Sequence, residues 1–141
     1  MVPENVQRFN SIVARIFELL YEDFPDSCDI GPDHFDLTAE VEGQMVWRDE
    51  AYQTVLSTVR WLAAEEYISL VGYSNGLCLA VTLTQKGLLV LNASPDSLSP
   101  GETVGGKIKS ALAGGSKALV SKVIEQALDI GVKYATAKVG L

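Results

Sequence analysis

The dipeptide Asn75-Gly76 lies between two apolar runs and constrains the fold of this chain more than any other feature. Asn-Gly favours a two-residue turn, because both central residues adopt positive φ, and it therefore predicts an antiparallel hairpin. Pairing outward gives Ser74–Leu77, Tyr73–Cys78, Gly72–Leu79, Val71–Ala80, Leu70–Val81 and Ile68–Leu83. In this register the inner face holds Ile68, Leu70, Leu79, Val81 and Leu83, while Tyr73, Cys78 and Ala80 face the other way.

Helical patterns flank this hairpin on both sides. Apolar residues recur every three to four positions over 49–66, and Asp49 is suited to cap the first turn. After the hairpin, Thr84 is suited to cap a short helix over 85–92. The segment 48–92 therefore predicts helix, hairpin and helix, joined by very short connections.

The N-terminal region predicts one long helix followed by an irregular stretch. Residues 3–24 carry an apolar stripe of helical period, and Pro25 ends the helix because a residue before proline avoids the α region. Residues 25–47 have the weakest pattern in the chain. They are compatible with a short helix within 33–42 that begins at an aspartate cap.

The central segment resembles the second half of a winged-helix domain. The run AEEYISLVG followed by AVTLTQKGLLVLN is similar to the ending of winged-helix transcription regulators, in which an acid or glycine, an aromatic residue and Ile precede Leu-Thr-x-Lys-Gly. The resemblance extends over about residues 3–92. It implies that 49–66 occupies the position of the recognition helix, 73–78 the wing and 3–24 the first helix.

We therefore predict an α+β, mostly helical fold. A winged-helix-like domain over 1–92 is followed by a linker over 93–106 and a basic, amphipathic helical tail over 107–141. Within the linker, Ser99 and Glu102 have the spacing of a capping box, so a helix is expected to begin there. Gly114 and Gly115 interrupt the apolar stripe of the tail and predict two helices or a kinked one, with 116–138 the stronger.

The resemblance implies duplex DNA as the partner, but the charges disfavour it. Phosphate contacts come from Lys and Arg, yet the exposed face of 49–66 with its flank offers only Arg48 and Arg60. Residues 1–104 hold 5 basic and 16 acidic residues, which repel a polyanion. We therefore expect contacts with another protein or with a second copy of the chain. The candidate contact residues are Gln53, Arg60, Trp61 and Tyr73.

The tail has the opposite charge, with 6 Lys against 2 acidic residues over 105–141. Its apolar stripe includes Leu119, Val123, Ile130 and Tyr134, which are the candidate residues of a tail interface. Three roles stay open from the sequence. The tail could assemble two copies of the chain, lie on an anionic membrane surface, or fold back on the acidic body, here residues 1–104.

The sequence shows no pattern of catalytic, cofactor or metal chemistry. Gly101 to Lys107 mimics the GxxxxGK phosphate loop, but Ile108 stands where Ser or Thr would bind magnesium. His34 is the only histidine, and the two cysteines lie far apart without metal-ligand spacing. We expect a non-enzymatic protein of the reducing cytoplasm, because there is also no signal-peptide pattern and no apolar run of about 18–20 residues.

Overall fold

The structure is a computed structural model of the 141-residue chain, and it describes residues 2–31, 34–35, 38–41, 44–47 and 51–140. The helices are α1 (Glu4–Asp23), α2 (Ala51–Ala64), α3 (Gln85–Asn92), α4 (Val104–Gly114) and α5 (Lys117–Gly140). The strands are β1 (Cys28–Ile30), β2 (Thr38–Val41), β3 (Gln44–Trp47), β4 (Ile68–Ser69), β5 (Gly72–Ser74) and β6 (Leu77–Leu83). The predicted α+β, mostly helical class is confirmed.

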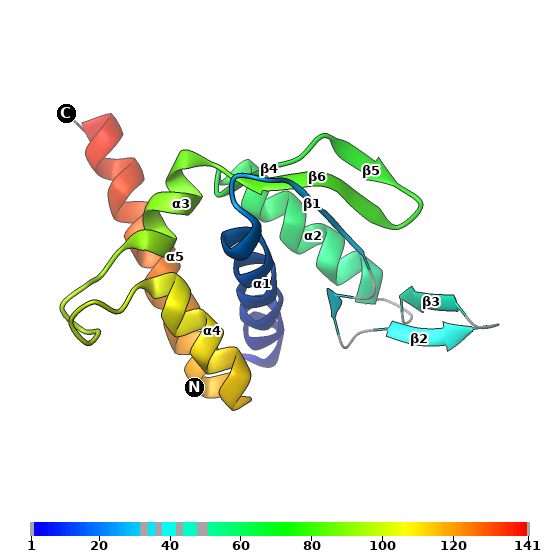
Figure 1. Cartoon of the computed structure of the whole chain (residues 1–141), viewed down its shortest axis with the longest axis horizontal. Helices are drawn as coiled ribbons and strands as arrows, with labels where there is room; N and C mark the ends of the chain where they lie inside the picture. Colours follow the sequence, from blue (N-terminus) through cyan, green and yellow to red (C-terminus); the bar gives the residue numbers. More distant parts are fainter. Residues whose placement is uncertain (1, 32–33, 36–37, 42–43, 48–50, 141) are drawn as a thin grey trace.

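Helix α1 lies at the centre of the molecule, with α2 and the sheet on one side and α3, α4 and α5 on the other (Figure 1). The central strand β6 pairs antiparallel with β1 on one edge and with β4 and β5 on the other. A small antiparallel sheet among helices is compatible with the winged-helix-like fold that the sequence resembles. Because β1 follows α1 directly and pairs with β6, it fixes the hairpin against the first helix.

The hairpin forms around Asn75-Gly76 with the predicted pairs at both ends. Tyr73 faces Cys78 and Ile68 faces Leu83, but the predicted pairs Val71–Ala80 and Leu70–Val81 do not form. Ala80 adopts φ 52°, and the register of β6 against β1 shifts by one residue at the same place. This β-bulge reverses the alternation of side chains.

Because of the bulge, the predicted inner and outer faces of β6 are wrong for residues 78–80. Cys78 is buried together with Val81 and Leu83, whereas Leu79 is only half-buried. The carboxylate of Asp29 on β1 accepts a hydrogen bond of 2.8 Å from the Ala80 N–H. Asp29 therefore satisfies a backbone donor that the bulge removes from the regular ladder.

Residues 38–47 differ from the helix considered for 33–42. Thr38–Val41 pairs antiparallel with Gln44–Trp47 as a separate two-stranded hairpin. β-branched and aromatic residues favour extended backbone, and Thr38, Val41, Val46 and Trp47 are of these types. The expected aspartate caps at 33 and 36, and Asp49 as the cap of α2, lie outside the described residues.

Helix α2 ends in a turn at Glu66, within the run AEEYISLVG. Glu66 adopts φ 67°, its N–H donates to the Ala63 carbonyl, and the Tyr67 N–H donates to the Leu62 carbonyl. These two bonds form a Schellman motif, with Glu66 where glycine is usual. The chain then turns Tyr67 inward and enters β4.

Helix α3 is held against the start of β4 by backbone contact. Thr84 caps it as predicted, accepting a hydrogen bond from the Gly87 N–H. The Thr84 N–H donates to the Tyr67 carbonyl, and a Cβ built on Gly87 would lie 2.2 Å from the same oxygen. Only glycine at 87 allows this separation.

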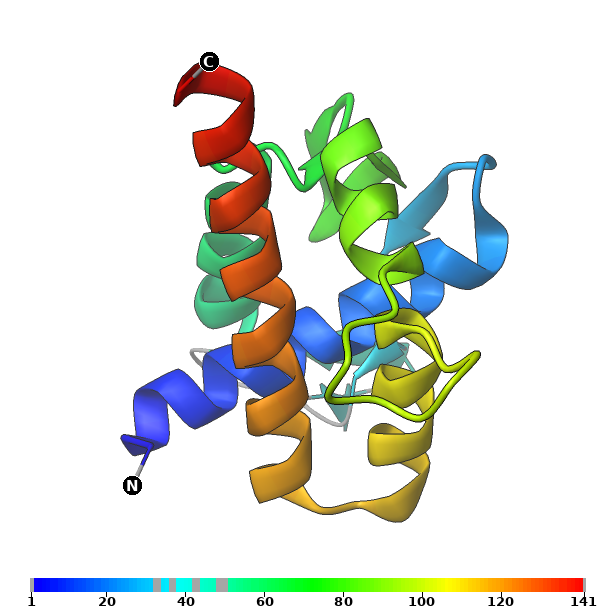
Figure 2. The same cartoon turned by 90° about the vertical axis from the view of Figure 1, so that its left-hand side faces the viewer.

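The tail forms two helices separated at Gly115, as predicted, and both lie on the body of the molecule. Gly115 adopts φ 74° and ends α4 in the left-handed conformation that favours glycine. Helix α5 crosses α1 and continues beside α3, with α4 next to its first half (Figure 2). Both helices share one core with α1 through Val104, Ile108, Ala111, Val120, Val123, Ile124 and Ala127.

The start of α4 differs from the prediction for Ser99. The helix begins after Thr103, whose side chain accepts a hydrogen bond from the Gly106 N–H. Ser99 and Glu102 instead close a turn, in which the Glu102 carboxylate accepts from the Ser99 N–H at 3.4 Å. Pro100 and Gly101 occupy this turn, and Gly101 adopts φ 84°. That conformation cannot continue into a right-handed helix.

Candidate protein-contact surface

Arg60 on the exposed face of α2 contacts Tyr73 of β5, and Trp61 follows Arg60 along the helix. We call these three residues the α2–wing surface; Gln53 was also predicted as a contact residue. The Arg60 guanidinium lies 5.6 Å from the centre of the Tyr73 ring. Tyr73 is 41% exposed, and Arg60 is also exposed. The hairpin register pairs Tyr73 with the buried Cys78, so the two side chains share the inner face of the hairpin and not the outer face that the sequence predicted. Tyr73 stays exposed because it lies beside the turn, and Arg60 of α2 covers its ring.

Trp61 connects this surface to the core. Its ring meets Phe9 of α1 edge-on at 5.2 Å and stacks on Tyr67 at 6.2 Å, while 40% of the residue stays exposed. Packing on two sides fixes the orientation of the indole. A partner would therefore meet a preorganised aromatic face, which lowers the entropy cost of binding.

Gln53 lies toward the N-terminal end of α2, exposed and separate from this aromatic cluster. Within residues 51–83, all of which are described, Arg60 is the only Lys or Arg. Lys86 follows on α3, but its ammonium donates to the Glu65 carbonyl and lies 4.3 Å from the centre of the Tyr67 ring. This surface therefore offers aromatic area and little positive charge.

Tyr67 was not among the residues singled out from the sequence, although it connects the two halves of the fold. It is 1% exposed, and its hydroxyl donates to the Leu128 carbonyl of α5 at 3.3 Å. A Cβ on Gly131 would lie 2.1 Å from that hydroxyl oxygen, so α5 needs glycine there. Burial first, and then the charge of Glu65, raises the pKa of the Tyr67 phenol. The sequence signal that could have identified Tyr67 is an aromatic residue directly after the end of a helix.

The four candidate residues of the tail interface lie in different environments. Val123 is buried in the core against α1, and Leu119 is 37% exposed on the outer side of α5. Ile130 packs half-buried against the core, and Tyr134 is half-buried further along the helix. Most of the apolar stripe therefore faces the inside of the monomer.

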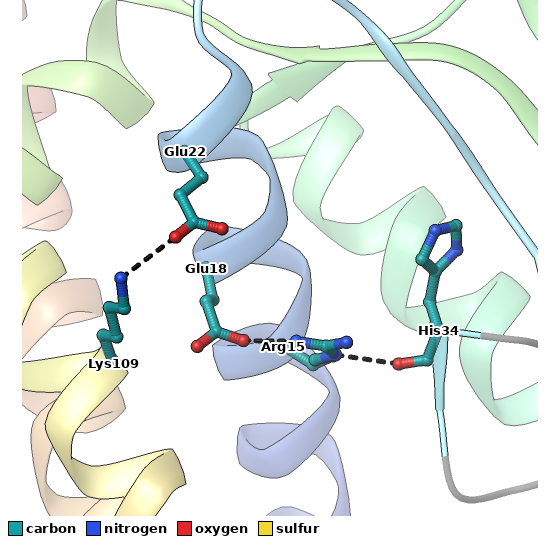
Figure 3. A network of polar contacts seen from close by, with 5 residues as sticks. All are labelled: Arg15, Glu18, Glu22, His34 and Lys109. Carbon is teal, nitrogen blue, oxygen red and sulfur yellow. Dashed lines mark hydrogen bonds and ion pairs between the residues drawn. The ribbon is translucent and has the colours of Figure 1, made fainter.

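Charged groups join the tail and the irregular segment to α1 (Figure 3). The Lys109 ammonium on α4 lies 3.0 Å from a Glu22 carboxylate oxygen, and this hydrogen bond, more than any other contact, raises the pKa of Lys109. Arg15 pairs with Glu18 and donates through Nε to the His34 carbonyl at 2.8 Å. Among the described residues, the ion pair Lys109–Glu22 joins the basic tail to the acidic body.

His34 and the cysteines have structural surroundings. His34 Nδ1 accepts a hydrogen bond from the Gly31 N–H at 3.1 Å. Burial raises the pKa of the Cys78 thiol to about 11, which opposes formation of a nucleophilic thiolate. Across the described part of the chain, no three His, Cys, Asp or Glu side chains are grouped as metal ligands. No described helix has the length and apolar character required to cross a bilayer.

Comparison with models of protein families, with curated proteins and with solved structures found no match to this chain.

Proposed function

We propose that this chain is a non-enzymatic, winged-helix-like protein that binds a second copy of itself through the α2–wing surface. The observation that carries the proposal is the stack of Arg60 on the exposed Tyr73 ring, with Trp61 held beside it on α2. Tyr, Trp and Arg are the residue types that dominate binding energy in protein interfaces. Two-fold pairing of identical surfaces is the commonest form of assembly in soluble proteins.

The residues around the cluster extend its apolar area. Val71, in the gap between β4 and β5, is 82% exposed. Exposed single apolar residues are ordinary, but here one adjoins an aromatic and guanidinium cluster on the same hairpin. A second chain would remove this area from water without having to desolvate many charges.

DNA binding through this surface is the second candidate. The position of α2 before a hairpin favours it, since this is where winged-helix proteins place their recognition helix. The charge opposes it, because affinity for duplex DNA depends on phosphates neutralised by Lys and Arg, and residues 51–83 supply Arg60 alone.

Binding to an anionic membrane through the tail has weaker support. An interfacial helix needs a free apolar face. Helix α5 buries Val120, Ile124 and Ala127 inside the monomer, so membrane binding would require it to leave the core.

Sedimentation velocity on the full chain tests the proposal. We expect a reversible dimer at micromolar concentrations and a dissociation constant raised about tenfold or more in Arg60→Ala/Tyr73→Ala, since both side chains are exposed and their removal leaves the core intact. Fluorescence anisotropy with a labelled random duplex at low salt tests the DNA candidate. Tight duplex binding that Arg60→Ala abolishes would replace dimerisation with DNA recognition.

A further inference from the structure

A groove of about 1310 Å³ lies between the first half of α1 and the start of α5, away from the α2–wing surface. His34, Phe35 and the end of α4 complete its walls. We propose that this groove, here called the α1–α5 groove, binds a small organic anion whose carboxylate, phosphate or sulfonate is joined to an apolar body. The inference does not depend on the proposed self-association.

Positive charge is concentrated in this groove although the chain as a whole carries a net charge of −7. Four cationic side chains line it, against the two carboxylates of Glu4 and Glu125; the four are Arg8, Arg15, Lys117 and Lys122. Arg8 lies 3.8 Å from Glu4, and Arg15 is held by Glu18 and the His34 carbonyl. Such a concentration of cations raises the local concentration of anions.

The two lysines from α5 are available to a ligand. Lys117 and Lys122 are exposed, and neither forms an ion pair with any described residue. This distinguishes them from Lys109 and Lys133, which pair with Glu22 and with Asp129 at 3.0 Å. Their ammonium groups can therefore contact an anion without breaking an existing pair.

The N-terminus of α5 contributes backbone donors at the same place. Ser116 accepts a hydrogen bond from the Leu119 N–H through its hydroxyl, which leaves the N–H groups of Lys117 and Ala118 as the open donors of the first turn. Both residues line the groove. The first turn of this 24-residue helix contains no acidic side chain, so no internal carboxylate compensates the positive end of its dipole.

Ser121 provides an independent indication of a ligand. It lines the groove one turn into α5 and is 2% exposed, and its hydroxyl has no hydrogen-bond partner in the structure. A buried hydroxyl without a partner destabilises the fold, so such groups are normally paired with protein, water or a ligand. The oxygen is covered in this conformation, and rotation about χ1 would bring the hydroxyl to an anion seated between Lys117 and Lys122.

The remaining walls specify the rest of the ligand. Phe35 and Leu112 are half-buried and add apolar surface to the lining. A bare inorganic anion would leave this surface wet, whereas an aromatic or alkyl body would cover it. A ligand that fits both the cations and this apolar surface is therefore an amphipathic anion.

Fluorescence titration of the full chain with 1-anilinonaphthalene-8-sulfonate tests the site, and N-phenyl-1-naphthylamine serves as the matched probe without the sulfonate. We expect saturable binding of the sulfonate, weakened about tenfold by Lys117→Gln/Lys122→Gln, because hydrogen bonds between ionised groups are stronger than those between neutral groups. The double variant Lys107→Gln/Lys133→Gln removes the same charge outside the groove and should leave the affinity within about twofold. Equal weakening by both pairs, or equal affinity for both probes, would overturn the proposal.

Ser121→Ala separates a ligand contact from a structural role. The variant should keep or raise the midpoint of thermal unfolding, since it removes an unpaired buried hydroxyl, and it should weaken sulfonate binding about fivefold. A lower midpoint together with unchanged binding would show that the hydroxyl serves the fold, and it would remove the observation on which the anion site depends.

Discussion

The α2–wing surface and the α1–α5 groove are both exposed, but they differ in how they use charge and shape. The first holds two partly exposed aromatic residues, Trp61 and Tyr73, with one guanidinium that lies over the Tyr73 ring. The second is concave and collects two arginines and two unpaired lysines from helices far apart in sequence. The first suits a protein surface and the second suits a small anion.

This difference explains the uneven charge of the chain. The lysines of the tail are not a uniform basic face. Lys109 and Lys133 neutralise carboxylates on α1 and α5, while Lys117 and Lys122 line the groove. Charge asymmetry along a sequence therefore has two separate causes here, intramolecular pairing and the concentration of cations at one groove.

Tyr67 connects the end of α2 to the second half of α5, and a substitution that displaces its backbone should have the largest effect on stability. Gly87→Ala places a Cβ 2.2 Å from the Tyr67 carbonyl oxygen and should lower the free energy of unfolding by about 3 kcal/mol. Gly114→Ala is the matched control, because nothing lies within 4 Å of its added Cβ. Denaturant unfolding followed by Trp fluorescence and by far-UV circular dichroism measures both.

If the two regions form one cooperative unit, the two signals should give the same midpoint in each variant. Separate midpoints would mean that the wing side and the tail side unfold independently. If Gly87→Ala lowers the free energy of unfolding no more than Gly114→Ala does, the close approach of Gly87 to the Tyr67 carbonyl is contradicted.

The buried thiol of Cys78 in the hairpin should make the folded chain less stable at high pH. The pKa of Cys78 is raised to about 11 in the folded chain, so the unfolded thiol ionises first as pH rises above its ordinary 9.0. Ionisation then favours the unfolded state, and stability should fall by about 2 kcal/mol between pH 8 and 10.5 from this group alone.

Cys78→Ala should remove that part of the pH dependence, and Cys28→Ala should retain it. Urea unfolding at several pH values measures the slope. An unchanged slope in Cys78→Ala would show that the bulge does not bury this thiol.

A smaller effect is expected where α2 passes into the wing. Glu66→Gly relieves a non-glycine residue at φ 67° and should raise the free energy of unfolding by about 1 kcal/mol. Glu66→Ala removes the same charge while keeping the strain, so it should change little. Thermal or urea unfolding distinguishes the two, and equal gains would assign the effect to charge.

The smallest effect concerns the Arg60–Tyr73 contact within the monomer. A double-mutant cycle with Arg60→Ala and Tyr73→Leu should give a coupling of about 0.5 kcal/mol, as expected for an exposed cation–π pair. The cycle is measured at protein concentrations too low for dimer formation, so the coupling free energy reports the contact within the monomer and not its part in dimerisation. A coupling of about 2 kcal/mol or more, as in desolvated cation–π pairs, would show that the contact stabilises the fold of the monomer.

Local patterns predicted much of the fold. Asn75-Gly76 determined the turn, Thr84 the start of α3 and Gly115 the break in the tail, because each acts through its own backbone geometry. The bulge at Ala80 could not be predicted, since it depends on Asp29 arriving from β1, 51 residues away. The start of α4 at Thr103 was missed for a local reason, because the positive φ of Gly101 turns the chain before the helix begins.

The two sites differed in how far the sequence indicated them. Arg60 and Trp61 could be proposed because helix periodicity places them away from the inner stripe of α2. Tyr73 was proposed from the hairpin faces, but it shares a face with the buried Cys78 and is exposed because it lies beside the turn. The groove could not be proposed, because Arg8 and Lys122 come together only where α1 and α5 cross. Helix crossings are set by packing over the whole core, which no local pattern encodes.

The central claim is that the α2–wing surface binds a second chain, and sedimentation velocity over about 1 to 100 µM tests it most directly. The wild type should dimerise, Arg60→Ala/Tyr73→Ala should be monomeric over most of this range, and Leu119→Ser on the outer face of α5 should dimerise like the wild type. A wild type that stays monomeric at the highest concentration, or a dimer that only Leu119→Ser disrupts, would contradict the claim.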